Sequence, residues 1–511
     1  MTAAQSPLFE PVLWEGNGFK ILDESQVPER IEYIPISEVS QALDAVKEMR
    51  TRAFGQVLTF LYAGALLARD YDAKESEPLR GQLTDMTQRF CAARPTFDFK
   101  GLGGYFSKWF DNMPSSAHAG EWIAQQAREF GAGIVNARQA RAQRTASILP
   151  NPARLLTHCN VSGELVAVAR ACREMGKEIS VLATETRPYL QGTRLTAWEL
   201  AQAGVPVSVI PDSAVAQVMA KGEVNAVLVG SDRCAQNGDI VNKVGTYPLA
   251  LMAKEYAIPF FALVQDPGSL ARGNDLEIEE RPMAELLIFQ GQSLIPFGDT
   301  GISVRYPAFD VTPSALITSL IGFDELSTPD SFRKKYQHST TAESHEDKHG
   351  RQYLLVYGLP KRASHSYLEQ ALKAEQGDSV LVPEMRPELR GAQIVAPALL
   401  KHGVPTTLIS DNMMGTLFAQ GQIKRLVLFY TGLGEAGPTG ICGSLLAARL
   451  ARAHDVPVEL LEAGDAEIDA PDRDVSTFLG HNVSPPGVSI YPIQPDVIPW
   501  EVLKEKSGSN S

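Results

Sequence analysis

The apolar positions of residues 151–326 fall into short runs separated by longer amphipathic segments. Two of these segments, 214–221 and 249–256, have helical periodicity. Three runs have the length and composition of buried strands: 207–210, 226–229 and 260–263. Because strands that alternate with helices pair in parallel, with helices on both faces of the sheet, this pattern predicts a Rossmann-like α/β domain.

Residues 1–150 have a different pattern. Segments 38–50, 55–69 and 121–145 combine helical periodicity with good helix formers, and few runs in this region have the character of strands. We therefore expect a separate, mainly helical domain that covers the first sheet.

The α/β pattern repeats at a constant offset of 199 residues. Arg187-Pro-Tyr-Leu-Gln-Gly192 recurs as Arg386-Pro-Glu-Leu-Arg-Gly391, and Asp212 recurs as Asp411. A register that persists through Gly and Pro positions is typical of internal duplication. The chain is thus expected to divide into four segments: a mainly helical domain at 1–150, a Rossmann-like domain at 151–326, a polar linker at 327–352 and a degenerate Rossmann-like repeat at 353–511.

The composition narrows the class of protein. A formal net charge of −13 disfavours binding to nucleic acid, whose phosphates require clustered Lys and Arg. No apolar run approaches the ~18 residues of a membrane helix, and the N-terminus lacks the features of a signal peptide. The five cysteines have neither metal-binding nor disulfide spacing. We expect a cytoplasmic protein with no metal and no membrane partner.

Residues with chemical potential follow the predicted strands of the first α/β domain. Cys159, Gln191 and Asp232 each come after an apolar run, and the carboxyl ends of parallel strands open on one edge of a sheet. Asn242 and Lys243 precede a predicted helix, where backbone N–H groups and an ammonium can hold an anion. Any one of these residues alone is explained by packing or helix capping, whereas their common position at one edge indicates a site.

The motifs around these residues resemble those of methylthioribose-1-phosphate isomerases, in a family that also includes ribose-1,5-bisphosphate isomerase and the α, β and δ subunits of initiation factor 2B. The resemblance rests on five motifs that occur in family order: Thr157-His-Cys-Asn160, Arg187-Pro-Tyr-Leu-Gln-Gly192, Gly230-Ser-Asp-Arg233, Asn242-Lys-Val-Gly-Thr246 and Pro307-Ala-Phe-Asp-Val-Thr-Pro313.

The resemblance implies a catalytic pair, Cys159 and Asp232, and no cofactor. It also implies a set of substrate- and phosphate-binding residues: Arg52, Ala53, Arg94, Gln191, Asn242 and Lys243. Arg52 lies in Arg52-Ala-Phe-Gly55, where the family usually has Arg-Gly-Ala-Pro, so the specificity at the sugar end stays open. His158 is expected to orient its loop or to fill space.

The chemistry of these residues fits an aldose–ketose isomerase that acts on a pentose 1-phosphate. A sugar phosphorylated on its anomeric oxygen opens only when its ring oxygen is protonated, and Asp232 would supply that proton if burial raised its pKa. Cys159 would then take the proton from C2 or donate one at C1, provided that nearby cations favour its thiolate, with a hydride shift from C2 to C1 as the alternative.

Three functions remain open from the sequence. The first is isomerisation of 5-methylthioribose 1-phosphate or a related 5-deoxypentose 1-phosphate. The second is the same reaction on ribose 1,5-bisphosphate or a pathway-specific sugar phosphate. The third is a scaffold without catalysis, like the initiation factor 2B subunits.

The second copy has lost the predicted site. Gly358 replaces Cys159, Thr431 replaces Asp232, and the equivalent of Lys243 is missing. We expect this copy to isomerise nothing and instead to occupy the face through which relatives dimerise, forming a pseudo-dimer within one chain. A homo-oligomer also remains possible.

Overall fold

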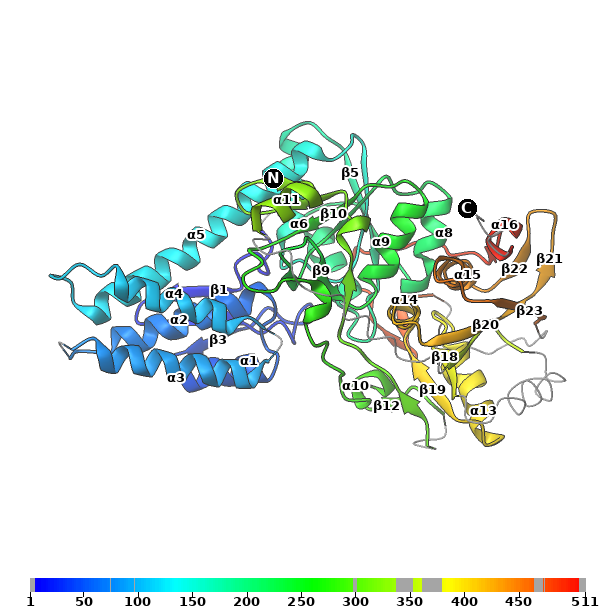
Figure 1. Cartoon of the computed structure of the whole chain (residues 1–511), viewed down its shortest axis with the longest axis horizontal. Helices are drawn as coiled ribbons and strands as arrows, with labels where there is room; N and C mark the ends of the chain where they lie inside the picture. The colour runs from blue at the N-terminus through cyan, green and yellow to red at the C-terminus, as the bar shows by residue number, and fades with distance from the viewer. Residues whose placement is uncertain are drawn as a thin grey trace.

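The computed structural model describes residues 5–73, 75–95, 97–296, 301–336, 353–360, 379–463, 472 and 474–504. Figure 1 shows an elongated molecule with a bundle of helices at one end and the large sheets, with their helices, at the other. Long helix α5 (Ala119–Ile148) runs from the bundle to the sheets. No helix in these ranges has the length and apolar character needed to cross a membrane.

The bundle combines helices with a small sheet. Its other helices are α1 (Val39–Lys47), α2 (Phe54–Arg69), α3 (Glu77–Ala93) and α4 (Phe99–Asp111). Strands β1 (Val12–Glu15), β2 (Gly18–Leu22) and β3 (Tyr33–Ile36) form an antiparallel sheet that the sequence pattern did not predict. Buried aromatic rings, among them Phe60 and Phe90, fill the core between these elements.

The first large sheet has eight strands in the order β16-β15-β10-β7-β4-β5-β6-β26. All neighbouring strands are parallel except β16 (Leu326–Ser327), which is antiparallel to β15. The parallel strands are β4 (Ala153–Thr157), β5 (Ile179–Thr184), β6 (Val207–Ile210), β7 (Ala226–Val229), β10 (Phe260–Leu263), β15 (Ser319–Ile321) and β26 (Ser489–Ile490). The three strands predicted from the sequence coincide with β6, β7 and β10.

Helices α6 (Glu164–Glu174), α7 (Trp198–Gln202), α8 (Val215–Ala220) and α9 (Thr246–Glu255) connect these strands. The chain passes from β4 outward to β5 and β6, then returns to β7 on the other side of β4. In doubly wound sheets, such a reversal opens a crevice at the carboxyl ends of the two central strands. The functional site is therefore expected next to β4 and β7.

The second large sheet has six parallel strands in the order β13-β19-β18-β17-β20-β23. They are β13 (Ser303–Val304), β17 (Tyr353–Tyr357), β18 (Ser379–Pro383), β19 (Thr406–Ile409), β20 (Ile423–Tyr430) and β23 (Val458–Glu462). Its helices include α13 (Ala396–Lys401), α14 (Met414–Ala419) and α15 (Ser444–Ala453). The molecule is thus a mixed α/β protein with two parallel-sheet regions. We refer to residues 353–504 as the C-terminal region.

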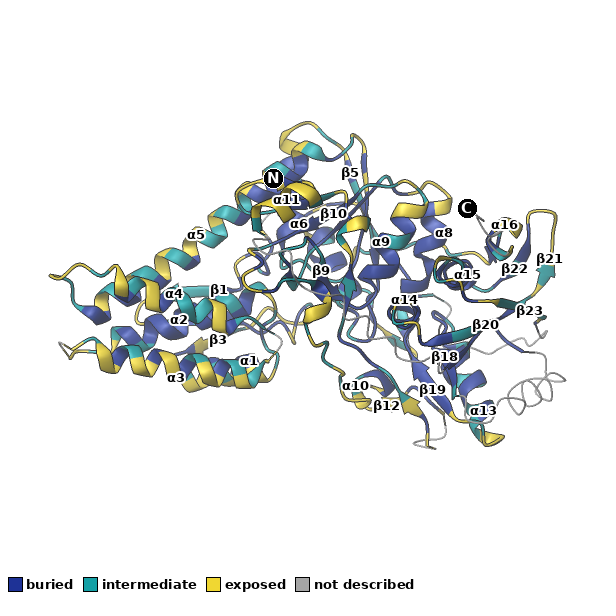
Figure 2. Cartoon of the chain, in the orientation of Figure 1, coloured by how far each residue is buried: buried dark blue, intermediate teal, exposed yellow. Residues whose placement is uncertain are grey.

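Each large sheet takes one edge strand from the other part of the chain. β26, near the C-terminus, pairs with β6 of the first sheet, and β13, which precedes the C-terminal region in sequence, pairs with β19 of the second. One apolar core also continues through both regions and includes Val227 and Leu355. Figure 2 shows that the sheets and the helices between them are buried, while outer helices such as α3 expose one face.

The predicted linker at 327–352 begins with ordered structure. Helix α11 spans Pro329–Tyr336, and its Phe332 is buried in the core. The polar composition concealed this helix because two aromatic side chains, Phe332 and the partly buried Tyr336, anchor it. Residues 337–352 of the predicted linker lie outside the described residues.

Candidate functional site

A pocket lies beside the carboxyl ends of β4 and β7, at the reversal point of the first sheet. Two further strands form its wall, β9 (Ile240–Lys243) and β14 (Phe309–Thr312), which pair antiparallel. Loops from the helical bundle close the opposite side. Among the lining residues are Arg52, Ala53, Arg94, Cys159, Tyr189, Gln191, Asp232, Arg233, Lys243, Glu277, Glu279, Arg281 and Tyr306.

Cys159 follows β4 with its backbone in the left-handed region, at φ 63°, which is unusual for a residue with a Cβ. Its N–H donates to Thr186 Oγ1 at 2.9 Å, and its carbonyl accepts from Thr196 Oγ1 at 2.6 Å. The Sγ lies 3.5 Å from Gln191 Oε1. These contacts hold a strained turn that directs the sulfur into the pocket.

The electrostatics of Cys159 favour the neutral thiol. Burial raises its pKa to about 11, although the nearby Lys243 ammonium opposes the shift. The thiol therefore carries its proton near neutral pH and is able to donate it.

Asp232 follows β7, where its N–H donates to Val241 O at 3.0 Å and its carbonyl accepts from Gln265 Nε2 at 2.7 Å. Burial raises the pKa of its carboxyl to about 6, against the opposing effects of Lys243 and Arg94. A carboxyl with this pKa exchanges a proton readily near neutral pH, as a general acid or base must.

Three cations surround this pair. Arg52 Nε and Arg94 Nε are buried, and neither has a hydrogen-bond partner among the described residues. Lys243 is 6% exposed, and burial lowers the pKa of its ammonium. Because buried cationic donors without acceptors destabilise a fold, their convergence indicates a site for an anion.

The other two cations of the pocket have acidic partners. Arg281 forms ion pairs with Glu279 and Glu285, and Arg233 lies 3.7 Å from Asp98. Within the described part of the pocket, the cationic charge left to bind an anion is thus that of Arg52, Arg94 and Lys243.

The structure brings seven of the eight residues expected at the site around this pocket: Cys159, Asp232, Arg52, Ala53, Arg94, Gln191 and Lys243. Asn242 is not among the lining residues. Side chains alternate along β9, so Lys243 faces the pocket while Asn242 is buried, with its Nδ2 donating to Thr246 Oγ1 at 2.9 Å.

His158 is buried beneath the site. Its Nδ1 lies 2.7 Å from Thr184 Oγ1 and its Nε2 lies 2.9 Å from Val244 O. Burial lowers the pKa of the imidazole to about 4, so the ring stays neutral and supports the Cys159 turn. This position agrees with the expectation that His158 orients its loop.

Two tyrosines at the site were not singled out from the sequence. The Lys243 Nζ lies 5.3 Å from the centre of the Tyr189 ring and donates to the Tyr306 hydroxyl at 3.0 Å. Tyr189 lies within the motif at 187–192, so its place at the site could have been predicted from that motif. Tyr306 lies just before the motif at 307–313, and its contact with Lys243 depends on tertiary structure.

In the C-terminal region, Gly358 follows β17 and Thr431 follows β20, and two contacts beside them resemble contacts of the pocket. The Thr431 N–H donates to Thr439 O at 2.7 Å, as the Asp232 N–H donates to Val241 O. Tyr357 donates to Cys442 O at 2.9 Å, where His158 contacts Val244 O. A search of the described residues finds no group of His, Cys, Asp and Glu suited to a metal ion.

Sequence comparison gives a family match over most of the chain. Residues 56–322 and 340–460 match the model of the Initiation factor 2 subunit family. The methylthioribose-1-phosphate isomerase of Desulforudis audaxviator (strain MP104C) is 36% identical over 330 residues, covering 61% of this chain and 92% of that protein. The methylthioribose-1-phosphate isomerase of Thermotoga petrophila is 36% identical over 328 residues, covering 60% of this chain and 92% of its own.

Two solved structures share the fold. The 5-methylthioribose 1-phosphate isomerase from Pyrococcus horikoshii OT3 has a TM-score of 0.57 at 30% identity and covers 66% of this chain and 99% of its own. Subunit delta of the translation initiation factor eIF-2B from A. fulgidus has a TM-score of 0.53 at 31% identity. The match covers 62% of this chain and 96% of that subunit. The resemblance inferred from the five motifs is confirmed, and the residues of the pocket must decide between an enzyme and a scaffold.

Proposed function

The chain belongs to the Initiation factor 2 subunit family, and we propose that it is an aldose–ketose isomerase within that family. Its substrate would be 5-methylthioribose 1-phosphate, or a ribose 1-phosphate with a related 5-substituent, and its product the ribulose 1-phosphate. The observation that carries the proposal is a thiol and a carboxyl, Cys159 and Asp232, in one pocket with three cations. A scaffold needs neither reactive group.

The phosphate is assigned to Arg52, Arg94 and Lys243, with Gln191 and Ala53 beside it and Asn242 supporting the turn before α9. Three converging cations suit a single dianionic phosphate. A second phosphate at C5 would require further cations, and both Arg281 and Arg233 already have acidic partners. This charge balance favours an uncharged 5-substituent over ribose 1,5-bisphosphate.

The proton transfers can be written so that both catalytic groups return to their starting state. Asp232 donates a proton to the ring oxygen as the bond from that oxygen to C1 breaks, and its carboxylate then removes the proton from C2. The Cys159 thiol protonates C1 of the resulting enol, and its thiolate takes the proton of the 2-hydroxyl as the C2 carbonyl forms. The raised pKa of Cys159 suits it to donate first.

A hydride shift from C2 to C1 requires proton exchange by only one catalytic group. Asp232 protonates the ring oxygen and later accepts the proton of the 2-hydroxyl, so Cys159 exchanges no proton. The two mechanisms therefore differ in the need for the thiol and in the origin of the new hydrogen at C1.

The proposed domain organisation gives the C-terminal region a structural role. We infer that segment 353–511 is a degenerate duplicate of segment 151–326, preceded by a linker at 327–352 and a helical domain at 1–150. The duplicate would occupy the dimerisation face of the first copy, making a pseudo-dimer within one chain.

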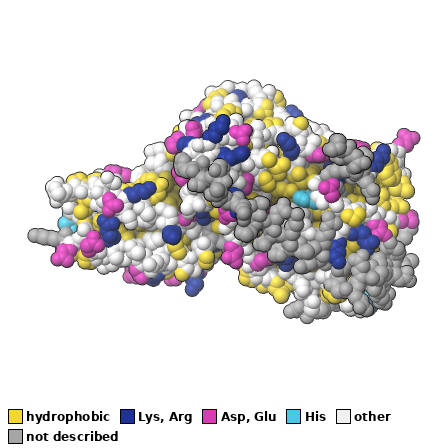
Figure 3. Space-filling view, in the orientation of Figure 1, with side chains coloured by type: hydrophobic (Ala, Val, Ile, Leu, Met, Phe, Trp, Pro, Cys, Tyr) yellow, Lys and Arg dark blue, Asp and Glu magenta, His cyan; other side chains and the backbone are white. Residues whose placement is uncertain are grey.

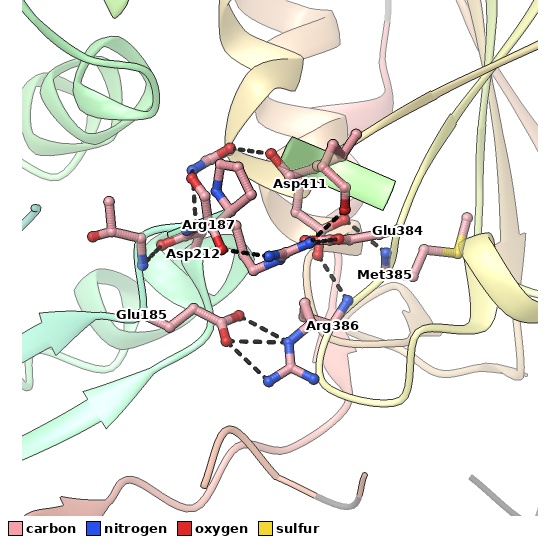
Figure 4. Close-up of polar contacts among 12 residues, drawn as sticks. Glu185, Arg187, Asp212, Glu384, Met385, Arg386 and Asp411 are labelled. Carbon is pink, nitrogen blue, oxygen red and sulfur yellow. Dashed lines mark hydrogen bonds and ion pairs between the residues drawn. The ribbon is translucent and has the colours of Figure 1, made fainter. Parts of the chain in front are cut away.

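Reciprocal contacts between the two copies support this arrangement. Buried Arg187 pairs with Glu384 at 2.8 Å, and Arg386 pairs with Glu185 at 2.9 Å (Figure 4). Asp212 accepts from the N–H of Arg187, and Asp411 accepts from the N–H of Arg386, both at 2.8 Å. Matching residues of the two copies thus exchange the same contacts, as in a two-fold interface.

A phosphorylated pentose is the only partner that the proposal requires, although a homo-oligomer is compatible with it. Figure 3 shows Lys and Arg interspersed with Asp and Glu among the described residues of the face in view, rather than gathered into a basic stripe of the kind that binds nucleic acid. All five cysteines are free, in keeping with a reducing cytoplasm.

The test is turnover of a panel of pentose 1-phosphates by the wild type and by Cys159→Ser, assayed for ketose product. We expect wild-type activity to be highest with 5-methylthioribose 1-phosphate or another uncharged 5-substituent. If Cys159 transfers a proton, kcat of Cys159→Ser falls roughly 10²-fold or more, and product made in D₂O carries deuterium at C1. Full activity of Cys159→Ser with no deuterium at C1 would support the hydride shift, and no turnover of any substrate would favour the scaffold.

A further inference from the structure

The pocket wall opposite Cys159 belongs to a segment that leaves the first sheet and returns to it. Glu279 and Arg281 line the pocket where the segment leaves, and Tyr306 and Ala308 line it where the segment returns. The Ala308 N–H donates to Glu279 O and the Arg281 N–H donates to Tyr306 O, each at 2.8 Å. The two ends of the segment therefore form one paired wall.

Between these ends, the segment contacts the C-terminal region. β13 adds a parallel edge strand to β19, with Ser303 opposite Thr407 and Val304 opposite Leu408. The Arg305 N–H continues the pairing by donating to Leu408 O at 3.2 Å. The returning chain is thus paired with β19 of the C-terminal region immediately before it reaches the pocket wall at Tyr306.

The Arg305 side chain ties this strand to both parts of the molecule. It contacts Gln422 Oε1 at 3.2 Å, at the start of β20, and Glu280 Oε1 at 2.7 Å. The other oxygen of the Glu280 carboxylate accepts the Tyr306 N–H at 3.0 Å. A chain of contacts therefore runs from buried Gln422 through Arg305 and Glu280 to the backbone of Tyr306.

Tyr306 ends this chain at the cationic cluster. Its side chain is 1% exposed, and its hydroxyl accepts from Lys243 Nζ at 3.0 Å. The centres of the Tyr306 and Tyr189 rings lie 5.2 and 5.3 Å from the ammonium Nζ. The flexible lysine side chain is thereby held in one position within the pocket.

We propose that the C-terminal region is a built-in positioning partner of the active site. Through β19 and Gln422 it fixes the β13 segment, and Tyr306 on that segment is a positioning residue that holds the Lys243 ammonium for the substrate phosphate. The role of Lys243 rests on the proposed function. The retention of a copy without catalytic groups then has a physical reason, since the C-terminal region holds one wall of the pocket in place.

The first test is Tyr306→Phe in the full chain, measured as KM and kcat for the best pentose 1-phosphate and as the Kd of ribose 1-phosphate by calorimetry. The variant keeps the ring and removes the acceptor of Lys243. We expect KM and Kd to rise roughly tenfold, with kcat within about threefold of wild type, because a hydrogen bond to a charged group is lost equally in the ground and transition states.

Tyr357→Phe is the matched control, since it removes another buried tyrosine hydroxyl, one that donates to Cys442 O away from the pocket. It should leave KM and Kd unchanged. Values for Tyr306→Phe within twofold of wild type would overturn the role of Tyr306. The calorimetric Kd decides this even if no substrate is turned over, so failure of the proposed function stays distinguishable.

The second test concerns the C-terminal region, using Gln422→Ala, Gln422→Glu and the control Gln420→Ala. Gln422→Ala removes one acceptor of Arg305, the one that Gln422 supplies from outside the pocket, so we expect a several-fold rise in KM and Kd. Gln422→Glu keeps an oxygen for Arg305 and should restore both. Gln420 lies on the same region without contacting Arg305, and its replacement should change neither value. Wild-type KM and Kd in Gln422→Ala would overturn the part of Gln422 in positioning the pocket wall.

Discussion

At the scale of single residues, burial sets the chemistry of the site. Asp232 and Cys159 lie in the same pocket, and burial raises the pKa of both. The carboxyl moves into the neutral pH range, whereas the thiol moves away from it. In the proposed proton-transfer mechanism the two groups thus suit different steps, with Asp232 exchanging protons near neutral pH and Cys159 starting as the protonated thiol that donates to C1.

The raised pKa of Asp232 predicts an alkaline decline in activity. A carboxyl with a pKa of about 6 is protonated below that pH, and its acid form decreases tenfold for each further pH unit. If that form opens the sugar ring, kcat/KM should fall as pH rises above about 6, measured between pH 5 and 9. Asp232→Asn should lose roughly 10²-fold or more in kcat and lose this dependence. An alkaline decline that persists in Asp232→Asn would assign it to another group, such as the substrate phosphate.

At the scale of elements, the loops after β5 and β18 join the two sheet regions through buried charges. The Arg386 guanidinium pairs with Glu185 and lies 3.4 Å from Asp472, and all three side chains are 1% exposed or less. Removing one partner of a buried pair leaves an uncompensated charge, which destabilises a protein far more than the loss of an exposed pair.

Arg386→Met should therefore lower the free energy of unfolding by about 3 kcal/mol or more, measured by urea denaturation. Adding Glu185→Leu should recover part of this loss because the second change removes the unpaired carboxylate. Arg333→Met is the control, since the Arg333–Asp330 pair is exposed and its loss should cost at most about 0.5 kcal/mol. Equal losses in Arg386→Met and Arg333→Met would contradict the structural role of the buried pair.

At the scale of the whole molecule, the two sheet regions are packed together and exchange edge strands. One apolar core runs through both, and each region supplies an edge strand to the sheet of the other. A chain that ends at Ser327 would lose β26 from the first sheet and the partner of β13. It would also expose apolar side chains of α8 and α9 that the C-terminal region covers.

We expect this truncated chain to lose activity by at least tenfold and to self-associate, as measured by analytical ultracentrifugation beside the full chain. The exposed face is apolar and has unpaired strand edges, both of which promote association. A truncated chain that stayed monomeric and fully active would refute the pseudo-dimer and the positioning role of the C-terminal region together.

The sequence by itself determined the periodic and local features. Runs such as 226–229 specified buried strands because their apolar pattern has one compatible structure in an alternating α/β chain. Cys159 and Asp232 follow two of these runs, β4 and β7. Their proximity then followed from the rule that the carboxyl ends of parallel strands share an edge. The expected repeat also predicted that Gly358 and Thr431 stand at the positions equivalent to Cys159 and Asp232.

Only the tertiary structure decided the contacts that depend on distant segments. The strands β1–β3 are short and sit beside strongly helical sequence, so their pattern was too weak to identify. The sequence could not show that Asn242 faces away from the pocket, that β13 pairs with β19 or that Tyr306 meets Lys243. Each of these depends on which face of a strand is covered and by what, and periodicity specifies an alternation of faces without specifying the partner that covers them.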